Sequence, residues 1–251
     1  MSDQQTGTSR PRIGAFHIIT GLILLFGVFL TVYRFTQGLG PMTNLNNEYP
    51  WGLWISFDLL CGVALAAGGF VTTAACYIFG LKKYHIAVRP AVLTAMLGYL
   101  LVVIALTYDV GRPWRLPYPF LVQSGATSVL FEVALCVMIY LLTLIAEYSQ
   151  VAFEWLRMSV ARSLVMKAIL FLTVLGVILS TMHQSSLGAL YLIAPSKMHP
   201  LWYSAFIPVF FFISAIVAGL SMVIVEMSLA RRFLRHKMDE AHERGYDDVV
   251  L

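Results

Sequence analysis

The sequence predicts an all-α protein, a bundle of about six helices that cross a membrane with both termini on the cytoplasmic side. Three observations support this prediction: the composition, a series of long apolar runs, and an uneven distribution of positive charge. Of the 251 residues, 59% are hydrophobic and 12% are charged, whereas soluble domains carry about 25% charged residues. The mean hydropathy is +0.78. A chain of this composition is expected to be solvated by lipid.

Six apolar runs are each long enough to cross a bilayer, which takes roughly 20 residues of helix. They lie near residues 14–35, 53–80, 90–108, 128–147, 164–183 and 204–230. The first run is too long for the apolar region of a secretory signal, and no small-residue cleavage site follows it. We therefore expect a retained first helix and a single transmembrane bundle over residues 1–232.

Positive charge indicates the orientation of these spans. Of the 17 Lys and Arg residues, all but Arg34, Arg112, Arg115 and Lys197 fall on one side of the predicted membrane. Cytoplasmic loops are enriched in Lys and Arg near helix ends. Both termini are therefore expected in the cytoplasm, which requires an even number of crossings. The net charge of +4 then reflects topology rather than binding to nucleic acid.

The segments between the spans are predicted from their turn-forming and charged residues. Between the first two spans lie the helix-breaking residues Gly38, Gly40, Pro41 and Pro50. They predict a loop outside the membrane. Segment 149–163 mixes apolar and charged residues at helical spacing, which predicts a helix along the cytoplasmic interface. Residues 233–251 are too charged to bury a core and are expected to form a cytoplasmic tail.

The glycine and cysteine residues within the spans support two different predictions. Small residues let helix backbones approach closely in lipid, so we expect Gly68 and Gly69 of the second span to be packing positions. The three cysteines lie within predicted spans: Cys61, Cys76 and Cys136. They lack the close spacing of a zinc or iron–sulfur motif. Neither a metal site nor a disulfide framework is predicted.

Four ionisable residues are predicted near the outer face of the membrane: Asp58, Asp109, Glu132 and His183. An ionisable group in lipid is costly enough to suggest a function. Glu132 lies about one turn inside its span, where capping by Thr127 or Ser128 does not explain it. A carboxyl group kept from water can hold or accept a proton at working pH, which general acid–base chemistry requires.

His183 is predicted to end the fifth span, next to Gln184. Imidazole can carry a proton near neutral pH. The alternative is that it only caps the carbonyl groups at a helix end. Since Glu132 is expected at a matching depth, we favour a functional role for both residues.

The two aspartates have structural alternatives. Asp58, about two turns inside the second span, either takes part in a site or anchors backbone groups. Asp109 and Arg112 either belong to that site or form a clamp. The 110–126 loop, rich in proline and aromatic residues, is a candidate lid.

Histidine also raises the possibility of haem. His17 begins the first span on the cytoplasmic side, whereas His183 lies on the outer side, so they cannot hold one iron. His199 shares the outer side but precedes Pro200 in a loop. The sequence therefore predicts no haem in this chain.

The cytoplasmic half contains three polar residues within predicted spans, namely Tyr140, Glu147 and Glu226. Either they continue a proton path inward from Glu132, or they lie at the membrane interface.

Several of these residues stand in motifs that resemble a known family. The stretches are NLNNEYPWGLWISFDLL, TYDVGRPW, SVLFE and TMHQSSLG. They are similar to motifs of the NrfD/polysulfide reductase C superfamily, and most closely to HybB-type membrane subunits of periplasmic nickel–iron hydrogenases. The resemblance runs from about Phe16 to about Arg232. Members of this family resemble one another in being haem-free, quinone-reactive subunits.

The resemblance implies partners and a location. A periplasmic iron–sulfur protein of the ferredoxin type would dock on the outer loops and exchange electrons with menaquinone or ubiquinone bound between the helices. A hydrogenase or another oxidoreductase would supply or take up these electrons. The chain would lie in the cytoplasmic membrane of a bacterium or archaeon.

The resemblance also implies roles for single residues. Glu132 would handle protons and His183 would lie on the quinone side, with Asp58, Asp109 and Arg112 in the surrounding network. We expect three further residues in the same pocket: Trp54, Gln184 and Trp202.

The chain departs from its HybB-type relatives in helix number, because these usually have about ten helices. The resemblance therefore implies a further membrane chain, a second copy, or a shortened form. The rival hypothesis is a membrane anchor, scaffold or ion-conducting subunit without quinone chemistry.

Overall fold

A computed structural model of the protein describes residues 14–46, 48, 52–122, 125, 127–193 and 195–234. All regular structure in these ranges is helical, which confirms the predicted fold class. Pro50 and residues 235–251 of the predicted tail lie outside the described residues. The chain divides into two compact units, Met1–Trp51 and Gly52–Leu251.

The first unit contains helix α1 (Ala15–Gln37) and the short helix α2 (Leu39–Thr43). Gly38 separates them with a φ of 89°, a left-handed conformation that glycine adopts without steric cost. None of the most apolar 18-residue window of α1 is buried. A helix that is apolar all round and unburied is suited to contact with lipid.

The second unit contains the other five long helices. They are α3 (Gly62–Tyr77), α4 (His85–Asp109), α6 (Val129–Trp155), α7 (Ser159–Ile193) and α8 (Ile207–Leu234). Six short elements complete the unit: η1 (Ser56–Cys61), η2 (Lys82–Tyr84), η3 (Pro113–Arg115), α5 (Tyr118–Leu121), η4 (Pro195–Lys197) and η5 (Pro200–Trp202).

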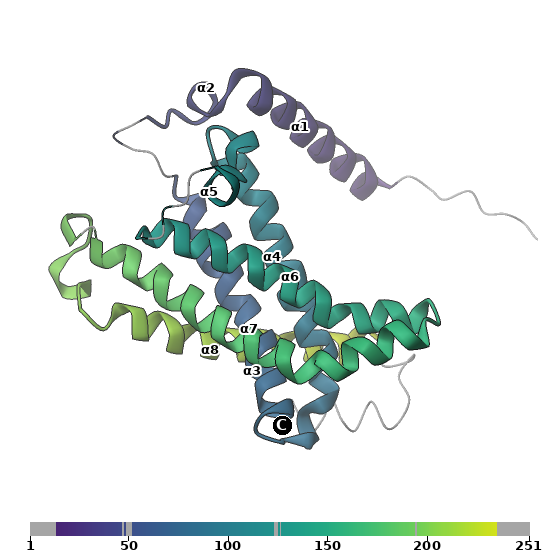
Figure 1. The fold of residues 1–251 in the computed structure, drawn as a ribbon. Helices are drawn as coiled ribbons and strands as arrows, with labels where there is room; N and C mark the ends of the chain where they lie inside the picture. The colour runs from purple at the N-terminus through teal and green to yellow at the C-terminus, as the bar shows by residue number, and fades with distance from the viewer. Residues whose placement is uncertain are drawn as a thin grey trace, which may run out of the picture. The chain divides into compact units, whose positions relative to one another are not determined.

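Helix α3 packs against α4, α7 and α8, and α6 pairs with α7 in an antiparallel hairpin. Figure 1 shows this hairpin passing across α3 and α4. We call the end of the bundle that carries Asp109 and Glu132 the outer end. The opposite end, which carries Arg89 and Arg162, is the inner end and is the one predicted to be cytoplasmic.

Six helices in the described ranges are long and apolar enough to cross a membrane, which confirms the predicted number. Two predicted boundaries are wrong. Helix α7 continues to Ile193, so His183 lies inside the helix rather than at its end. Its polar neighbours Gln184 and Ser186 are buried in the bundle and do not interrupt the helix.

The second wrong boundary concerns segment 149–163, which is not a separate interfacial helix. Residues up to Trp155 extend α6. Arg157 then adopts a left-handed φ of 57°, and α7 begins at Ser159. The charged residues of this segment end one spanning helix and begin the next.

Close helix packing depends on glycine, as predicted. A methyl group added at Gly68 of α3 would overlap the backbone of Gly219 in α8, and one added at Gly219 would overlap the backbone of Gly68. At Gly69 an added methyl group would overlap the side-chain methyl group of Ala95 in α4. These contacts bring α3 close to two neighbouring helices, where lipid supplies no hydrophobic drive for packing.

Candidate functional site

A groove of about 690 Å³ lies between η1 and α3 on one side and α4 on the other. This volume is in the range of small-molecule sites, about 300–1,000 Å³. Its walls are mainly apolar and include Leu65, Leu97, Leu101, Val102 and Ile104. Four side chains add polar atoms: Asp58, Cys61, Thr94 and Tyr108.

The groove is long and has a polar group at each end. Tyr108 and Thr94 are 14 positions apart on α4, which corresponds to about 21 Å along a helix. Asp58 lies with Tyr108 toward the outer end. At the inner end, Thr94 Oγ1 donates a hydrogen bond to the carboxylate of Glu226 on α8. The groove can therefore hold a ligand with a polar head and a long apolar tail.

Asp58 reaches the groove from a π-helical turn. The backbone over Ser56–Cys61 forms i→i+5 hydrogen bonds before the α-helix begins at Gly62. Single π-turns of this kind often mark functional sites because they redirect a side chain. Asp58 is partly buried and Cys61 is exposed at the same turn.

Near the outer end of the bundle, a hydrogen bond joins distant parts of the sequence. Trp54 Nε1 donates to Asp109 Oδ1 at 2.6 Å. Asp109 follows Tyr108, which lines the groove. The predicted pocket residues Trp54 and Asp109 are thus brought together, and their contact joins the beginning of the second span to the end of α4.

Behind the groove, His183 is fully buried among α3, α4 and α7. Its Nδ1 lies 2.9 Å from Tyr99 Oη, while its Nε2 has no hydrogen-bond partner. The neighbouring Gln184 Nε2 donates to the backbone oxygen of Val63 on α3 at 3.2 Å. His183 is therefore held in one orientation with one ring nitrogen free.

Five further polar residues continue inward from His183, and we call all six the polar column. The column consists of Tyr99, Tyr140, Glu147, Thr173, Ser180 and His183, all of which are buried. The rings of Tyr99 and Tyr140 meet edge to face at 4.7 Å. Ser180 lies next to the hydroxyl groups of both tyrosines, and Thr173 lies next to the Glu147 carboxyl group.

Comparison with known proteins identifies the family. Residues 41–244 match the family described as polysulphide reductase, NrfD. The chain belongs to the NrfD family. No solved structure matches the chain.

Three relatives of this NrfD chain show its range of similarity. It is 60% identical over 248 residues to a protein of Nitratidesulfovibrio vulgaris, covering 99% of this chain and 64% of that protein. It is 41% identical over 220 residues to the probable Ni/Fe-hydrogenase 2 b-type cytochrome subunit of Escherichia coli, covering 87% and 56%. It is 30% identical over 195 residues to the menaquinone reductase integral membrane subunit of N. vulgaris, covering 74% and 46%. The chain spans about half to two thirds of the length of these relatives.

The E. coli relative is named a b-type cytochrome subunit. The histidines of this NrfD chain therefore decide whether its helices could hold a haem. A b haem held by two histidines requires them to face each other from helices at one depth. Within the described ranges His183 is the one buried histidine, whereas His17, His85 and His199 are exposed. Its ring also packs against Tyr99 at 5.6 Å. A bis-histidine haem does not fit the described helices, and no group of three metal-ligating side chains occurs there.

The remaining predicted site residues lie apart from the groove lining. Glu132 is partly buried in the first turn of α6, next to Cys136, which in turn neighbours Tyr99. Arg112 is exposed, and Trp202 is 75% exposed on η5. The structure therefore places Asp58 in the groove lining, pairs Trp54 with Asp109, and pairs His183 with Tyr99.

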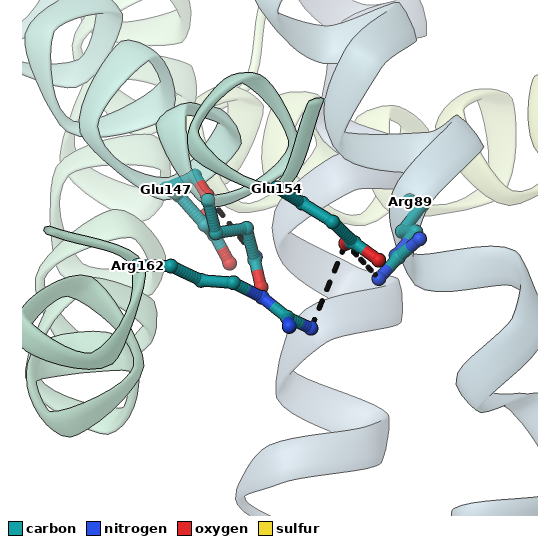
Figure 2. A network of polar contacts seen from close by, with 5 residues as sticks. Arg89, Glu147, Glu154 and Arg162 are labelled. Carbon is teal, nitrogen blue, oxygen red and sulfur yellow. Dashed lines mark hydrogen bonds and ion pairs between the residues drawn. The ribbon is translucent and has the colours of Figure 1, made fainter. Parts of the chain in front are cut away.

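At the inner end of the bundle, Glu154 of α6 lies between two arginines. Its Oε2 is 2.8 Å from Arg89 Nη2 and 3.6 Å from Arg162 Nη2. Figure 2 shows these contacts, with Glu147 on the same helix. This network ties α4 to both helices of the α6–α7 hairpin.

The sequence analysis missed three members of the polar column: Tyr99, Thr173 and Ser180. Each is a polar residue in the middle of an apolar run, which is the signal that could have identified them. Tyr99 was overlooked because an aromatic ring in such a run reads as apolar. The π-turn at Asp58 has no comparable signal in the sequence.

Proposed function

We propose that this NrfD-family chain is a quinone-reactive membrane subunit, without haem, that passes electrons between a periplasmic iron–sulfur protein and the quinone pool. The observation that carries the proposal is the groove with Asp58 at its outer end. A quinone has a ring with two carbonyl groups and a long apolar tail. Asp58 and Tyr108 suit the ring, and the apolar walls along α4 suit the tail.

Reduction of a quinone takes two electrons and two protons, so proton carriers are needed near the ring. Asp58 is the carboxyl group that lines the groove. We propose that it hydrogen-bonds a ring oxygen, while Glu132 and His183 hold protons behind it. His183 Nε2 has no hydrogen-bond partner, and this ring nitrogen can either donate or accept a proton, depending on the tautomer. Trp54 and Asp109 would keep the outer rim of the groove in place.

The partners follow from the same proposal. A ferredoxin-like subunit would dock at the outer end, close to Asp58, and a hydrogenase or another oxidoreductase would lie beyond it. The named relatives are subunits of a hydrogenase and of a menaquinone reductase. We further propose that the chain works in a bacterial or archaeal cytoplasmic membrane, with menaquinone or ubiquinone as substrate, and joined by another membrane chain or a second copy.

The test is quinone turnover by the assembled complex carrying Asp58→Asn. We expect turnover to fall about 100-fold, the lower range for losing a positioned proton carrier. Reduction of an artificial dye by the catalytic subunits should stay unchanged, since dyes accept electrons before the membrane subunit. Glu132→Gln should lower turnover in the same assay. Unchanged quinone turnover in both variants would refute the proposal.

Cys61 offers a second test, which separates a quinone site from a membrane anchor. It lines the groove and is exposed. A quinone analogue bound in the groove should slow labelling of Cys61 by a membrane-permeant maleimide. Cys76 and Cys136 are buried and provide the internal reference. Labelling that is indifferent to the analogue favours the anchor or scaffold hypothesis.

A further inference from the structure

The groove along α4 has one side that faces lipid. Three of its lining side chains on α4 are large, apolar and exposed: Leu97 by 45%, Leu101 by 64% and Ile104 by 47%. Exposed apolar side chains of a spanning helix lie against lipid tails, which are as apolar as they are. A ligand dissolved in the bilayer can therefore enter the groove from the side, anywhere along its length.

The floor of the groove is set by helix packing. Gly62 and Ala66 of α3 and Gly98 of α4 line it. A methyl group added at Gly98 would lie 3.2 Å from the Ala66 methyl carbon, and one added at Gly62 would lie 2.8 Å from a methyl carbon of Val102. The two helices are therefore in contact along the floor, and the course of the groove is fixed by backbones rather than by flexible side chains.

Helix α8 marks the inner end of the groove. Met222 of α8 is part of the lining. Glu226, one turn further along α8, accepts the hydrogen bond that Thr94 donates from the last groove position on α4. An apolar chain cannot take the place of either partner, and a hydroxyl or carboxyl group left unpaired in the membrane is costly. For an apolar ligand the groove thus ends at this pair.

We propose that the groove selects quinones by the length of their tail, with Leu97 and Met222 holding the far part of the tail and the Thr94–Glu226 pair marking its limit. The inference rests on the proposed quinone function. It adds the class of substrate: quinones with a long polyprenyl tail, in preference to rings with a short tail or none.

The distance along α4 gives the tail length that fits. Tyr108 and Thr94 are separated by about 21 Å of helix. An extended prenyl unit spans about 4.5–5 Å, because it has four chain bonds where an amino-acid residue with three spans roughly 3.3–3.6 Å. About four units therefore fill the groove. Further units would leave through the open side into lipid.

The expected preference is modest because the tail comes from lipid and not from water. Moving it into the groove buries no additional apolar surface from water, so what remains is closer packing against fixed walls. One methylene in an apolar pocket is worth about tenfold or more when water is the competitor. We expect about fivefold for the far part of the tail when lipid is the competitor.

The test compares quinone analogues that share one ring and carry no tail or two, four or six prenyl units. The complete complex is reconstituted in liposomes, and kcat/KM is measured for each analogue. Each value is divided by that for the tail-less analogue with the same preparation, so the amount of folded complex cancels. Partition of an analogue into the bilayer is the same for every variant, so it cancels when variants are compared with the wild type.

Leu97→Trp is the principal variant. Leu97 lies about 16 Å along α4 from Tyr108, which four prenyl units reach and two units, about 10 Å long, do not. The substitution should lower the ratio about fivefold for four and six units and leave it within about twofold for two units. Met222→Trp, from the opposite helix, should show the same dependence on length.

Leu100→Trp is the matched control on the same helix. Leu100 is 41% exposed, close to the 45% of Leu97, but does not line the groove. Its substitution should leave every ratio within about twofold of the wild type. Ile104→Trp provides a second comparison nearer the ring, because Ile104 lies only about 6 Å from Tyr108 along α4. It should lower the ratio for two units as well as for four.

The possible failures are distinguishable. If the wild type reduces quinone but Leu97→Trp and Met222→Trp lower the ratios for two and four units equally, or not at all, the tail does not follow the groove and the inference is wrong, while the quinone function stands. If Leu100→Trp lowers the ratios as strongly as Leu97→Trp, the groove has no special part in tail binding. If the wild-type complex reduces none of the analogues, the proposed function and the tail preference fail together.

Discussion

The groove and the polar column are two polar regions of one helix bundle, and they differ in what surrounds their polar atoms. In the groove, Asp58 and Tyr108 stand at an open edge among apolar walls. In the column, Tyr99, Tyr140 and His183 are at most 1% exposed, and several polar atoms lack a partner. An open edge can be satisfied by a ligand, whereas a closed column can be satisfied only by enclosed water. The difference makes the groove suited to a bound ligand and sets the column apart as an enclosed polar part of the bundle.

The two regions share α3 and α4, so a change that displaces α3 should damage both. Gly219→Val would place a side chain against the backbone of Gly68, which cannot move aside as a flexible side chain can. We expect the free energy of unfolding to fall by roughly 3 kcal/mol, the upper range for overpacking. Thermal unfolding of the detergent-solubilised chain measures it.

The matched control is Gly27→Val in α1, where an added methyl group would meet no atom within 4 Å. Its unfolding temperature should stay close to that of the wild type. An equal loss in both variants would show that the Gly68–Gly219 contact has no special part in holding α3.

A substitution that fills the groove should affect quinone binding without changing the polar column. Ala105 lines the groove, and Ala105→Trp would occupy part of it. Quinone turnover should fall about tenfold or more, equivalent to losing roughly 1.4 kcal/mol of transition-state stabilisation. The matched control is Leu142→Trp on α6. Leu142 is 58% exposed, so a larger side chain there should have little effect on quinone turnover. If Ala105→Trp turns over quinone at the wild-type rate, the substrate binds elsewhere.

The sequence predicted the number of spanning helices well because bilayer thickness fixes their length. It predicted their ends less well. The polar run after His183 was interpreted as a helix end, but Gln184 and Ser186 turn into the bundle, and the helix continues for ten residues past His183. Which side of a helix is buried depends on its neighbours, and no single segment encodes them.

The sequence drew attention to Asp58 and Glu147 because a charged residue in an apolar run is itself a signal. In the structure Asp58 lines the groove and Glu147 is buried within its span. The contacts that give these residues their surroundings could not be predicted. Trp54 meets Asp109 across 55 positions, and Thr94 meets Glu226 across 132. Such pairs arise only once the helices have packed.

Tyr99→Phe tests the column without altering the groove. It removes the hydroxyl group that lies 2.9 Å from His183 Nδ1 and leaves both ring nitrogens of His183 without a protein partner. We expect about 1–2 kcal/mol of destabilisation, the range for an unmade buried hydrogen bond. Thermal unfolding of the detergent-solubilised chain should show this loss, while analogue protection of Cys61 stays unchanged because Tyr99 does not line the groove.

Tyr191→Phe is the matched control for this change. Tyr191 is only partly buried and packs its ring at 5.4 Å from Phe211, away from the polar column. Its hydroxyl group should contribute little to stability. Should Tyr191→Phe lower the unfolding temperature as much as Tyr99→Phe, the hydrogen bond to His183 would not be the cause.

The smallest effect is expected at the inner surface. The side chains of Arg89 and Glu154 are 56% and 43% exposed, so water and salt screen their pairing. Arg89→Gln should lower stability by about 0.5 kcal/mol or less, and added salt should shrink the difference further. Arg162→Gln should have a smaller effect still, because its contact with Glu154 is longer, at 3.6 Å. A loss as large as that of Tyr99→Phe would mean that this network is shielded from water in the assembled complex.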